Sequence, residues 1–480
     1  MKSTILGKSL TLKIWFKFLL VVLPLTVIWA LANPMFASPD EPAHMVRAQG
    51  IIHGDSKEPY VTDGIPSNEV ACMAFNWDIT ADCMNLAWGT QGEVQGSPTD
   101  TYPPLFHAVA GIPSLVFDGL KGAYIMRLWM AFVCSSMIAL AATLLWFRRQ
   151  HIWSIGGLIA ALTPMVVFTS ATVNPSGITS ALASLIWAGG LNITKPTETT
   201  NHRLSRWTFI ASVILFPLLR RDALAWEIVV LAILAATISL KRLIELKRDR
   251  LMLGALVALT ANMVFVWFTW SGTATDSFVS NSASHGGGSW ASGLGSLYTK
   301  ILEMIGWFGW QDSPMTSESW VLLLCLLFGV ISIAATGGEK SLSRTLVITV
   351  SALVLAPVII GTVRYPYVQG RYLLPLWVGC GMLAGQALAE SDLPKLFLQR
   401  IFKTFIGLMA IIQFFAFAQN LRRYAVGRTG SWKFFQLSNW HPPMMTNLVA
   451  LLLMAVALSI SLLSVRSICQ TESSPQYSVS

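Results

Sequence analysis

The sequence predicts an all-α protein that crosses a membrane with about twelve helices. Hydrophobic residues make up 54% of the 480 residues and charged residues only 12%, against about 45–50% and 25% in ordinary soluble domains. Apolar runs of about 20 residues recur along the chain, and each could cross about 30 Å of hydrocarbon as a helix. Water is therefore not the main solvent of this chain.

The apolar runs divide the chain into twelve predicted spans, at residues 18–36, 123–147, 152–171, 177–193, 207–219, 223–240, 251–270, 320–336, 345–363, 372–389, 401–419 and 445–465. No fixed-period repeat and no soluble domain interrupts them, so we expect one membrane-embedded domain over residues 1–480. Arg220, Arg221 and Asp222 join two short spans with almost no loop, which puts two guanidiniums at a helix end.

The distribution of Lys and Arg predicts a cytoplasmic N-terminus, because Lys2, Lys8, Lys13 and Lys17 precede the first span. Threading twelve spans from there leaves most basic residues inside and most acidic residues outside. The net charge of +9 then reflects insertion and contact with anionic lipid, which excludes nucleic-acid binding as its explanation. A cleaved signal peptide ending near Ala30-Leu31-Ala32 is the alternative interpretation of the N-terminus.

Two segments on the non-cytoplasmic side, 37–122 and 271–319, are too long to be simple connectors. We expect the first to be ordered on the membrane surface, with helical stretches near 40–52 and 103–118. The second begins with a Ser/Gly-rich stretch, Ser280 to Gly295, typical of a mobile flap. An apolar and aromatic helix from Leu297 to Trp310 should follow it.

Two of the six cysteines, Cys72 and Cys83, lie in the first long loop. An oxidising compartment would allow a disulfide between them, which would hold together a loop without a large core of its own. Two unpaired thiols are the alternative. The other four cysteines lie in or beside spans as small apolar residues.

The strongest local motif runs from Ser38 to His44 (Ser-Pro-Asp-Glu-Pro-Ala-His), directly after the first span. Ser38 or Asp40 can cap a helix, and Asp40, Glu41 and His44 then lie within one turn. Such a cluster can accept a proton from an attacking hydroxyl or hold a divalent cation between Asp40 and Glu41. The alternative is a capped interfacial helix whose acids interact with the helix dipole.

Positive charge on the side that normally avoids it is the second signal. In this topology it comprises Arg220, Arg221, Arg364, Arg371, Arg422, Arg423, Arg428 and Lys433. Arginine binds phosphate oxygens in a bidentate manner, so a phosphate or diphosphate on a lipid carrier is a natural partner. Salt bridges to loop acids, or contacts with ordinary phospholipid headgroups, are the alternative.

Aromatic residues accompany these charges. The turn from Tyr365 to Pro375 (Tyr-Pro-Tyr-Val-Gln-Gly-Arg-Tyr-Leu-Leu-Pro) and the run from Gly306 to Asp312 (Gly-Trp-Phe-Gly-Trp-Gln-Asp) could be interfacial anchors or platforms for a sugar ring. We interpret the lone His107 and His441 as structural. The sequence has no P-loop, Rossmann fingerprint, zinc-ligand pairing or Gly-x-Ser-x-Gly elbow, which excludes common soluble-nucleotide and hydrolase chemistry.

Together the Ser38 to His44 run, Asn174-Pro175, Gly309 to Asp312 and Gln369 to Pro375 resemble a bacterial family of predicted membrane proteins known as domain of unknown function 2142. The resemblance covers about residues 18–420 and implies the bacterial plasma membrane. That family is similar in organisation to the type C glycosyltransferases, which use polyprenyl-phosphate sugars at the outer membrane face. Gln311 stands where a more apolar residue is expected.

This resemblance implies an inverting glycosyltransferase that moves a sugar from a polyprenyl-phosphate carrier to an extracytoplasmic glycan or protein acceptor. It places the catalytic base or metal contact on Asp40, beside Glu41. We expect Arg220, Arg221, Arg364 and Arg371 to bind the phosphate, and His44, Arg47, Tyr102, Trp310 and Tyr372 to shape the sugar pocket. A flippase or exporter of lipid-linked glycans, or a polymerase or ligase of them, is the alternative function.

Overall fold

The computed structural model describes residues 2–55, 60–63, 72–84, 91–95, 97, 99, 102–285, 289–364 and 369–472. Its description of side chains omits residues 2–8, 60–63, 91–95, 270–285, 361–364 and 471–472. The predicted role of the Arg364 side chain and the turn at 365–368 therefore lie outside the described residues.

The described chain is almost entirely helical. Its α-helices are α1 (Lys2–Ala32), α2 (Glu41–Ile52), α3 (Leu105–Gly111), α4 (Gly119–Arg148), α5 (Ile152–Ala161), α6 (Pro164–Ser170), α7 (Pro175–Thr194), α8 (His202–Leu215), α9 (Ala223–Ala236), α10 (Leu240–Lys247), α11 (Arg250–His285), α12 (Trp290–Gly306), α13 (Ser317–Gly337), α14 (Lys340–Arg364), α15 (Leu374–Ala389), α16 (Lys395–Val426) and α17 (Asn447–Glu472). Short 3-10 helices are η2 (Ala81–Cys83), η3 (Ile112–Leu115), η4 (Phe216–Leu218) and η5 (Gly370–Leu373). The strands form two antiparallel pairs, β1 (Tyr60–Asp63) with β2 (Gln91–Gln95) and β3 (Trp307–Phe308) with β4 (Ser313–Pro314).

The prediction of an all-α polytopic membrane protein is confirmed. Within the described residues, nine helices are long and apolar enough to cross a membrane, and two bent helix pairs raise the number to 11. The predicted span that is not among these 11 is 207–219; it corresponds to α8 followed by η4, and α8 has only 14 residues. The predicted span at 223–240 is α9, after which the chain bends by 117° into α10.

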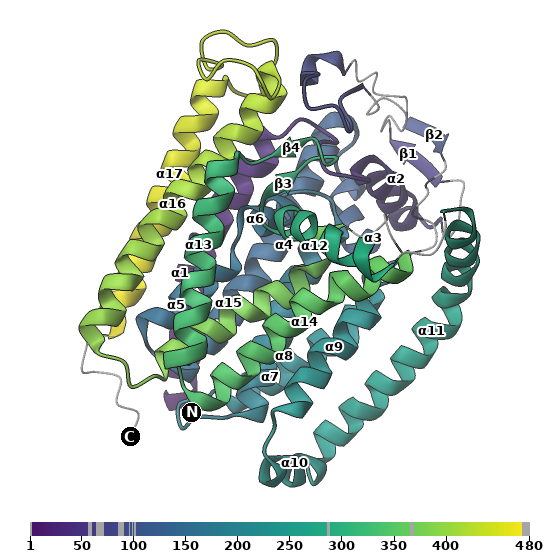
Figure 1. Ribbon diagram of the computed structural model, residues 1–480. Helices are drawn as coiled ribbons and strands as arrows, with labels where there is room; N and C mark the ends of the chain where they lie inside the picture. The colour runs from purple at the N-terminus through teal and green to yellow at the C-terminus, as the bar shows by residue number, and fades with distance from the viewer. Residues whose placement is uncertain are drawn as a thin grey trace.

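The bundle is centred on two helices that other helices surround. Windows of α7 and of the η5–α15 segment are each 94% buried inside the protein, whereas the apolar window of α11 is 11% buried. Figure 1 shows α11 at the edge of the bundle and α15 crossing its middle. Glycines let α5 and α15 approach closely, since a Cβ on Gly385 would overlap the backbone of Gly157.

Breaks in the helices occur where the sequence supplies stop and start signals. The α5–α6 pair bends by 70° at Thr163, whose hydroxyl accepts from the Val166 amide before Pro164 begins α6. Asn174 caps α7 in the same way, ahead of Pro175. These two breaks leave the segment 170–175 free to contact the loop after α1.

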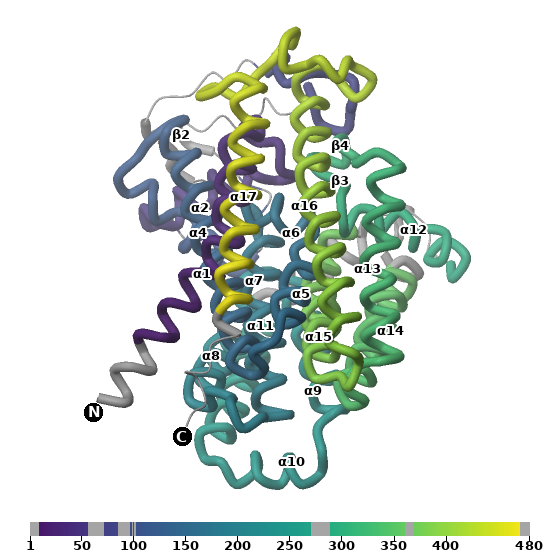
Figure 2. Tube along the Cα trace, turned by 90° about the vertical axis from the view of Figure 1, so that its left-hand side faces the viewer, coloured from purple at the N-terminus to yellow at the C-terminus, as the bar shows by residue number. Residues whose placement is uncertain are grey.

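The long loops gather at one end of the bundle, which we call the loop end. It carries α2, both strand pairs and the long hairpin between α16 and α17, while α1 begins and α17 ends at the opposite end (Figures 1 and 2). Helices stand where the sequence predicts them near 40–52 and 103–118. In the Ser280 to Gly295 stretch, α11 extends to His285 and α12 starts at Trp290; residues 286–288 lie outside the described part, and the flap stays a prediction.

Candidate functional site

Asp40 lies at the loop end, at the junction between α1 and α2. Its backbone is left-handed, with φ of 62°, a conformation that Asp adopts more readily than most residues. Contrary to the prediction, its side chain makes no capping bond to α2. Its Oδ2 instead lies 3.2 Å from Nη2 of Arg371. The side chain is 46% exposed, so this carboxylate can be reached from outside.

The segment before Asp40 is held by the start of α7. The Asn174 amide donates to the Pro39 carbonyl over 2.9 Å and to the Ser38 hydroxyl over 3.3 Å. Its amide oxygen accepts from the backbone N–H of Ser176 at 2.9 Å. One asparagine thus caps α7 and fixes the backbone that presents Asp40.

Glu41, the next residue, points the opposite way, into the protein. Its two oxygens accept from Nε and Nη2 of Arg127 at 2.8 and 2.6 Å, and Oε1 also accepts from the Val173 amide at 3.0 Å. Both side chains are fully buried. Arg127 also donates to the carbonyls of Ala30, Asn33 and Pro34. We therefore give Glu41 a structural part, in place of the predicted catalytic and metal-binding one.

Arg371 approaches Asp40 from a distant part of the chain, because η5 is anchored on α12. The Gly370 amide donates to Glu303 over 2.6 Å, and Glu303 also pairs with Lys300 at 2.9 Å. Arg371 is only 7% exposed, and its Nε has no hydrogen-bond partner among the described residues. A buried guanidinium with an unused donor can accept a further anionic partner.

Arg220 completes the positive side of the site. Its guanidinium lies 3.8 Å from the centre of the Tyr372 ring, and that of Arg371 lies 5.6 Å from the same ring. Its Nε lies 2.6 Å from Asp222 and its Nη1 donates to Ser176 over 3.0 Å. Two arginines therefore flank one tyrosine beside the exposed carboxylate of Asp40.

His44 and His107 form a buried pair close to the arginines of this site. Nδ1 of His44 lies 3.1 Å from Nε2 of His107, and Tyr102 and Phe106 lie against the His44 ring. Burial, and then the nearby charges of Arg371, Arg220 and Arg47, hold the pKa of His44 well below its usual value. Burial and the neighbouring His44 do the same to the pKa of His107. Both rings are therefore neutral near pH 7.

Two further residues of the first loop, Arg47 and Tyr102, were predicted to shape the sugar pocket, and their surroundings differ. Arg47 is buried and donates to the backbone carbonyls of Thr99 and Tyr102, so it supports the loop and its charge is not presented to a ligand. The Arg221 guanidinium lies 5.6 Å from the centre of the Tyr102 ring. Burial raises the pKa of the Tyr102 hydroxyl, which keeps it a neutral hydrogen-bonding group.

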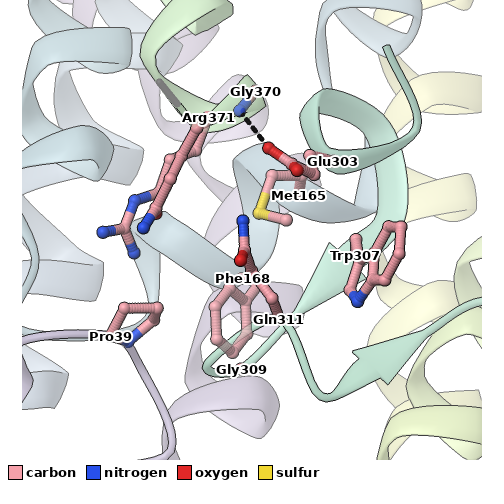
Figure 3. A pocket seen from close by; sticks show the side chains of 10 residues that line it. Pro39, Met165, Phe168, Glu303, Trp307, Gly309, Gln311, Gly370 and Arg371 are labelled. Atoms are coloured by element: carbon pink, nitrogen blue, oxygen red, sulfur yellow. Dashed lines mark hydrogen bonds between the residues drawn. The ribbon is translucent and has the colours of Figure 1, made fainter. Parts of the chain in front are cut away.

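A narrow pocket opens next to Arg371. Figure 3 shows Arg371, Pro39 and Gln311 around it, with Phe168 and Met165 behind. Its volume of about 10 Å³ is roughly the room of one water molecule. Trp307 lines this pocket, whereas the predicted Trp310 donates to the Phe36 carbonyl over 2.9 Å and contacts Phe75. Any larger ligand must displace side chains here.

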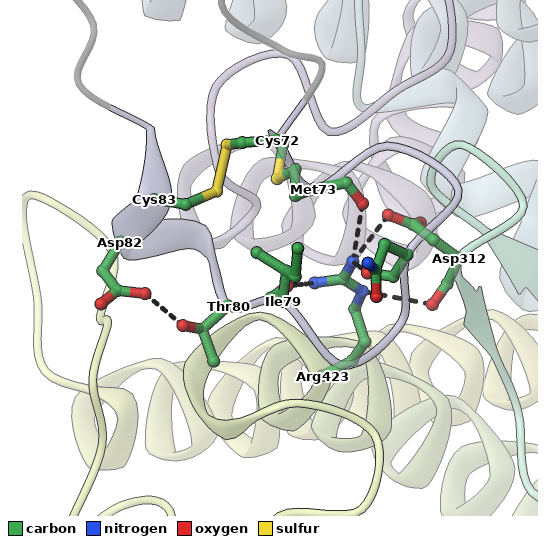
Figure 4. Close-up of a disulfide and its surroundings, with 9 residues drawn as sticks. Cys72, Met73, Ile79, Thr80, Asp82, Cys83, Asp312 and Arg423 are labelled. Carbon is green, nitrogen blue, oxygen red and sulfur yellow. Dashed lines mark hydrogen bonds and ion pairs between the residues drawn. A yellow bond between two sulfur atoms is a disulfide. The ribbon is translucent and has the colours of Figure 1, made fainter.

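A second fully anchored arginine lies on the other side of the β3–β4 hairpin. Arg423 donates to Asp312 over 2.8 Å and to the carbonyls of Met73, Asn76 and Ile79 (Figure 4). Those carbonyls belong to the loop closed by a disulfide between Cys72 and Cys83, whose Cα atoms are 6.2 Å apart. Burial raises the pKa of Asp312 to about 6, and Arg423 opposes this shift.

The residues do not fit a metal centre. Across the described part of the chain, no three His, Cys, Asp or Glu side chains gather where they could hold a metal ion. Asp40 faces an arginine, and Glu41 is occupied by Arg127. We derive no chemical step through a metal.

Comparison with known proteins shows the family to which this chain belongs. A model of the family of predicted membrane proteins designated DUF2142 matches residues 23–380. The chain belongs to this family. Among curated proteins, none matches it.

Two structures of ArnT from Cupriavidus metallidurans align with this chain. The one bound to undecaprenyl phosphate is 13% identical with a TM-score of 0.47, and the alignment covers 98% of this chain and 78% of that chain. The apo structure is 12% identical with a TM-score of 0.46, covering 92% and 76%.

Asp40, Arg220, Arg371 and Tyr372 all fall inside the segment that the family model matches, while Arg423 lies outside it. Sequence reasoning missed the roles of Arg127 and Asp222. For Arg127 a signal existed, because it is an ionisable residue inside the predicted span 123–147, and such residues have partners inside the protein.

Proposed function

We propose that this protein is an inverting membrane glycosyltransferase that moves a sugar from a polyprenyl-phosphate carrier to an extracytoplasmic acceptor, a glycan or a protein. It would act in the bacterial plasma membrane, with its N-terminus in the cytoplasm and the loop end on the opposite face. The observation that supports this most is the exposed carboxylate of Asp40 beside Arg371, whose Nε has no partner in the described chain.

The geometry suits a displacement reaction at a sugar carbon. Asp40 accepts the proton of the acceptor hydroxyl as the acceptor oxygen attacks the anomeric carbon. The bond from that carbon to the phosphate oxygen breaks, and the carrier leaves as a polyprenyl phosphate. Attack from the face opposite the leaving group inverts the anomeric centre. In this structure Arg371 is paired with Asp40. The donor phosphate would therefore replace Asp40 as the partner of Arg371, and the freed carboxylate could then act as the base.

The positive residues match the charge that develops on the leaving phosphate. Arg371 and Arg220 are both about 7% exposed, and a charge interaction is stronger in such a site than in water. The Tyr372 ring lies near both guanidiniums, 3.8 Å from that of Arg220 and 5.6 Å from that of Arg371. We assign Arg221 to the same phosphate with Tyr102 beneath it, and the neutral His44 to hydroxyl groups of the sugar.

The first experiment compares wild type with Asp40→Asn in lipid, using a panel of radiolabelled polyprenyl-phosphate sugars. The substitution removes the base but keeps the size of the side chain, so transfer should fall by about 10²–10⁴-fold. Asp392→Asn, at an exposed aspartate beyond α15 at the opposite end of that helix, is the matched control and should transfer like wild type.

Full transfer by Asp40→Asn would remove Asp40 from the catalytic role. Carrier binding that depends on Arg371, without turnover of any donor, would favour a flippase or exporter of lipid-linked glycans. Turnover of only preassembled lipid-linked chains would favour a polymerase or ligase.

A further inference from the structure

A second pocket at the loop end takes no part in the chemistry above. It has a volume of about 230 Å³, far more than the pocket at Arg371. The ends of α13 and α16 and the turn after α16 line it, with Thr316, Ser317, Gln419, Arg422 and Arg428 among the lining residues. The β3–β4 hairpin contributes to both pockets, since Trp307 lines one and Pro314 the other.

Two arginines of this pocket, Arg422 and Arg428, are held in place by neighbouring groups but have no carboxylate partner among the described residues. Arg422 lies 4.2 Å from the Trp432 ring centre and donates to the carbonyls of Arg428 and Gly430. Arg428 lies 4.6 Å from the ring centre of Trp77. In the described part of the chain neither guanidinium forms an ion pair, and Nε of Arg422 has no partner.

Arg422 and Arg428 are the positive groups that this pocket can offer to a ligand. Arg423 is matched by Asp312, while Glu318 of the lining, and Asp78, which accepts from Thr429 over 3.5 Å, form no ion pair with Arg422 or Arg428 in the described part of the chain. A phosphodiester, with a single negative charge, could bind these two guanidiniums. The hydroxyls of Thr316 and Ser317 and the amide of Gln419 could bind hydroxyl groups beside it.

Two apolar stripes run from this polar pocket along the membrane-spanning helices. On α16, Ile411 and Phe415 are 49% and 47% exposed and share a face with Gln419 and Arg422. On α13, Val321 and Phe328 are 60% and 68% exposed and share a face with Glu318 and Cys325. Helices α13 and α16 lie side by side in Figures 1 and 2 and are in contact.

We propose that this pocket binds the headgroup of an anionic glycerophospholipid, with one acyl chain along each stripe. A phosphodiester head, neighbouring hydroxyls and two hydrocarbon chains match the charge, the lining and the two stripes together. A polyprenyl phosphate would offer a single chain. The exposed Trp77 and Trp432 suit the interfacial level at which a headgroup lies. This inference is independent of the transferase proposal.

Native mass spectrometry of the purified protein tests it, with phosphatidylglycerol and phosphatidylcholine offered at equal concentration. Wild type should retain phosphatidylglycerol preferentially. The double variant R422Q/R428Q should weaken phosphatidylglycerol binding about 25-fold, at about fivefold for each arginine. Arg466→Gln, an exposed arginine near the end of α17, is the matched control and should bind like wild type.

A competition on the wild-type protein needs no variant and so covers the case in which the double variant does not fold. Lysophosphatidylglycerol, with one acyl chain, should displace phosphatidylglycerol less well than a two-chain lipid of the same headgroup. Equal retention of both phospholipids, or full binding by a folded double variant, would overturn the proposal. Displacement by inorganic phosphate alone would also overturn it, as would binding of undecaprenyl phosphate that R422Q/R428Q weakens, and either result would assign the pocket to that ligand.

Discussion

The two arginine-lined regions of the loop end are built alike but differ in how their charges are used. Each contains one buried arginine that binds a carboxylate and several backbone carbonyls. In the region around Asp40, Arg371 and Arg220, which we call the Asp40 region, this is Arg127, and it binds Glu41. In the pocket lined by Arg422 and Arg428, which we call the outer pocket, it is Arg423, and it binds Asp312. Above these anchors the regions diverge. Arg371 and Arg220 each contact a carboxylate and are almost completely buried, whereas Arg422 and Arg428 contact carbonyls and tryptophans.

Under our two proposals, this difference separates a site for chemistry from a site for binding. In the Asp40 region a ligand must exchange with an existing ion pair inside a pocket with room for about one water molecule. Such a site discriminates strongly, because a poorly fitting ligand leaves buried charges without partners. The outer pocket has a volume of about 230 Å³, and in the described chain Arg422 and Arg428 have no ion pair to exchange, which suits a ligand as abundant as a membrane lipid.

The largest expected stability effect tests the anchor of the Asp40 region. Glu41→Gln would leave the guanidinium of Arg127 buried without its charge partner, which should destabilise the protein by about 3–5 kcal/mol. Asp40→Asn should cost less than about 1 kcal/mol, because its ion pair with Arg371 is half exposed on the carboxylate side. Thermal unfolding in detergent measures both. If the two neighbouring substitutions cost the same, the assignment of Glu41 to the scaffold is wrong.

An intermediate effect is expected from the disulfide, which closes the loop whose carbonyls bind Arg423. Replacing Cys72 and Cys83 by serine opens a loop closed over a sequence separation of 11 and should cost about 2–3 kcal/mol. Hydrogen exchange should rise in residues 72–84, whose carbonyls bind Arg423, and should stay unchanged in α2. Cys325→Ser, at an exposed free cysteine, is the control. Faster exchange in α2 as well would show that the two regions are not independent.

A third effect concerns pH and comes mainly from the buried histidine pair of the Asp40 region, while His151 at the start of α5, whose pKa burial lowers to about 4, adds a smaller share. His44 and His107 have pKa values below the usual 6.5 in the folded protein, so below that pH the unfolded chain binds protons that the folded chain does not. Stability is therefore complete above about pH 6.5 and should fall in acid by about 1.4 kcal/mol per pH unit for each histidine. Melting temperatures from neutral pH down to about pH 5.5 measure this slope. His107→Gln should make it shallower, and an unchanged slope would place the acid response elsewhere.

The sequence predicted the architecture well because membrane solvation imposes a strong rule on every residue of a span. Eleven of the twelve predicted spans correspond to helices or bent helix pairs that satisfy length and hydropathy in the described chain. The helices near 40–52 and 103–118 followed from local signals of the same kind, such as a proline in the first turn. Such patterns are local and can be read along the chain.

The site was predicted only in outline. The sequence placed Asp40, Arg220 and Arg371 at the same membrane face, but nothing local shows that Asp40 and Arg371, 331 residues apart, come together. Asp40 and Glu41 are adjacent carboxylates, and their sequence context does not distinguish an exposed acid from a buried one. The left-handed backbone at Asp40 turns one outward, and the packing of α4 supplies Arg127 to the other.

The sequence by itself therefore determined the environment in which this protein folds. A chain that is mainly apolar must place its helices in hydrocarbon, where each helix satisfies its own backbone hydrogen bonds. Tertiary structure alone decided which charges are anchors and which face a ligand. That choice depends on partners brought from distant helices, because a buried arginine is tolerated only where a carboxylate and carbonyls converge on it. Arg127 and Arg423 meet that condition, and Arg371 and Arg422 keep a donor unpartnered within the described residues.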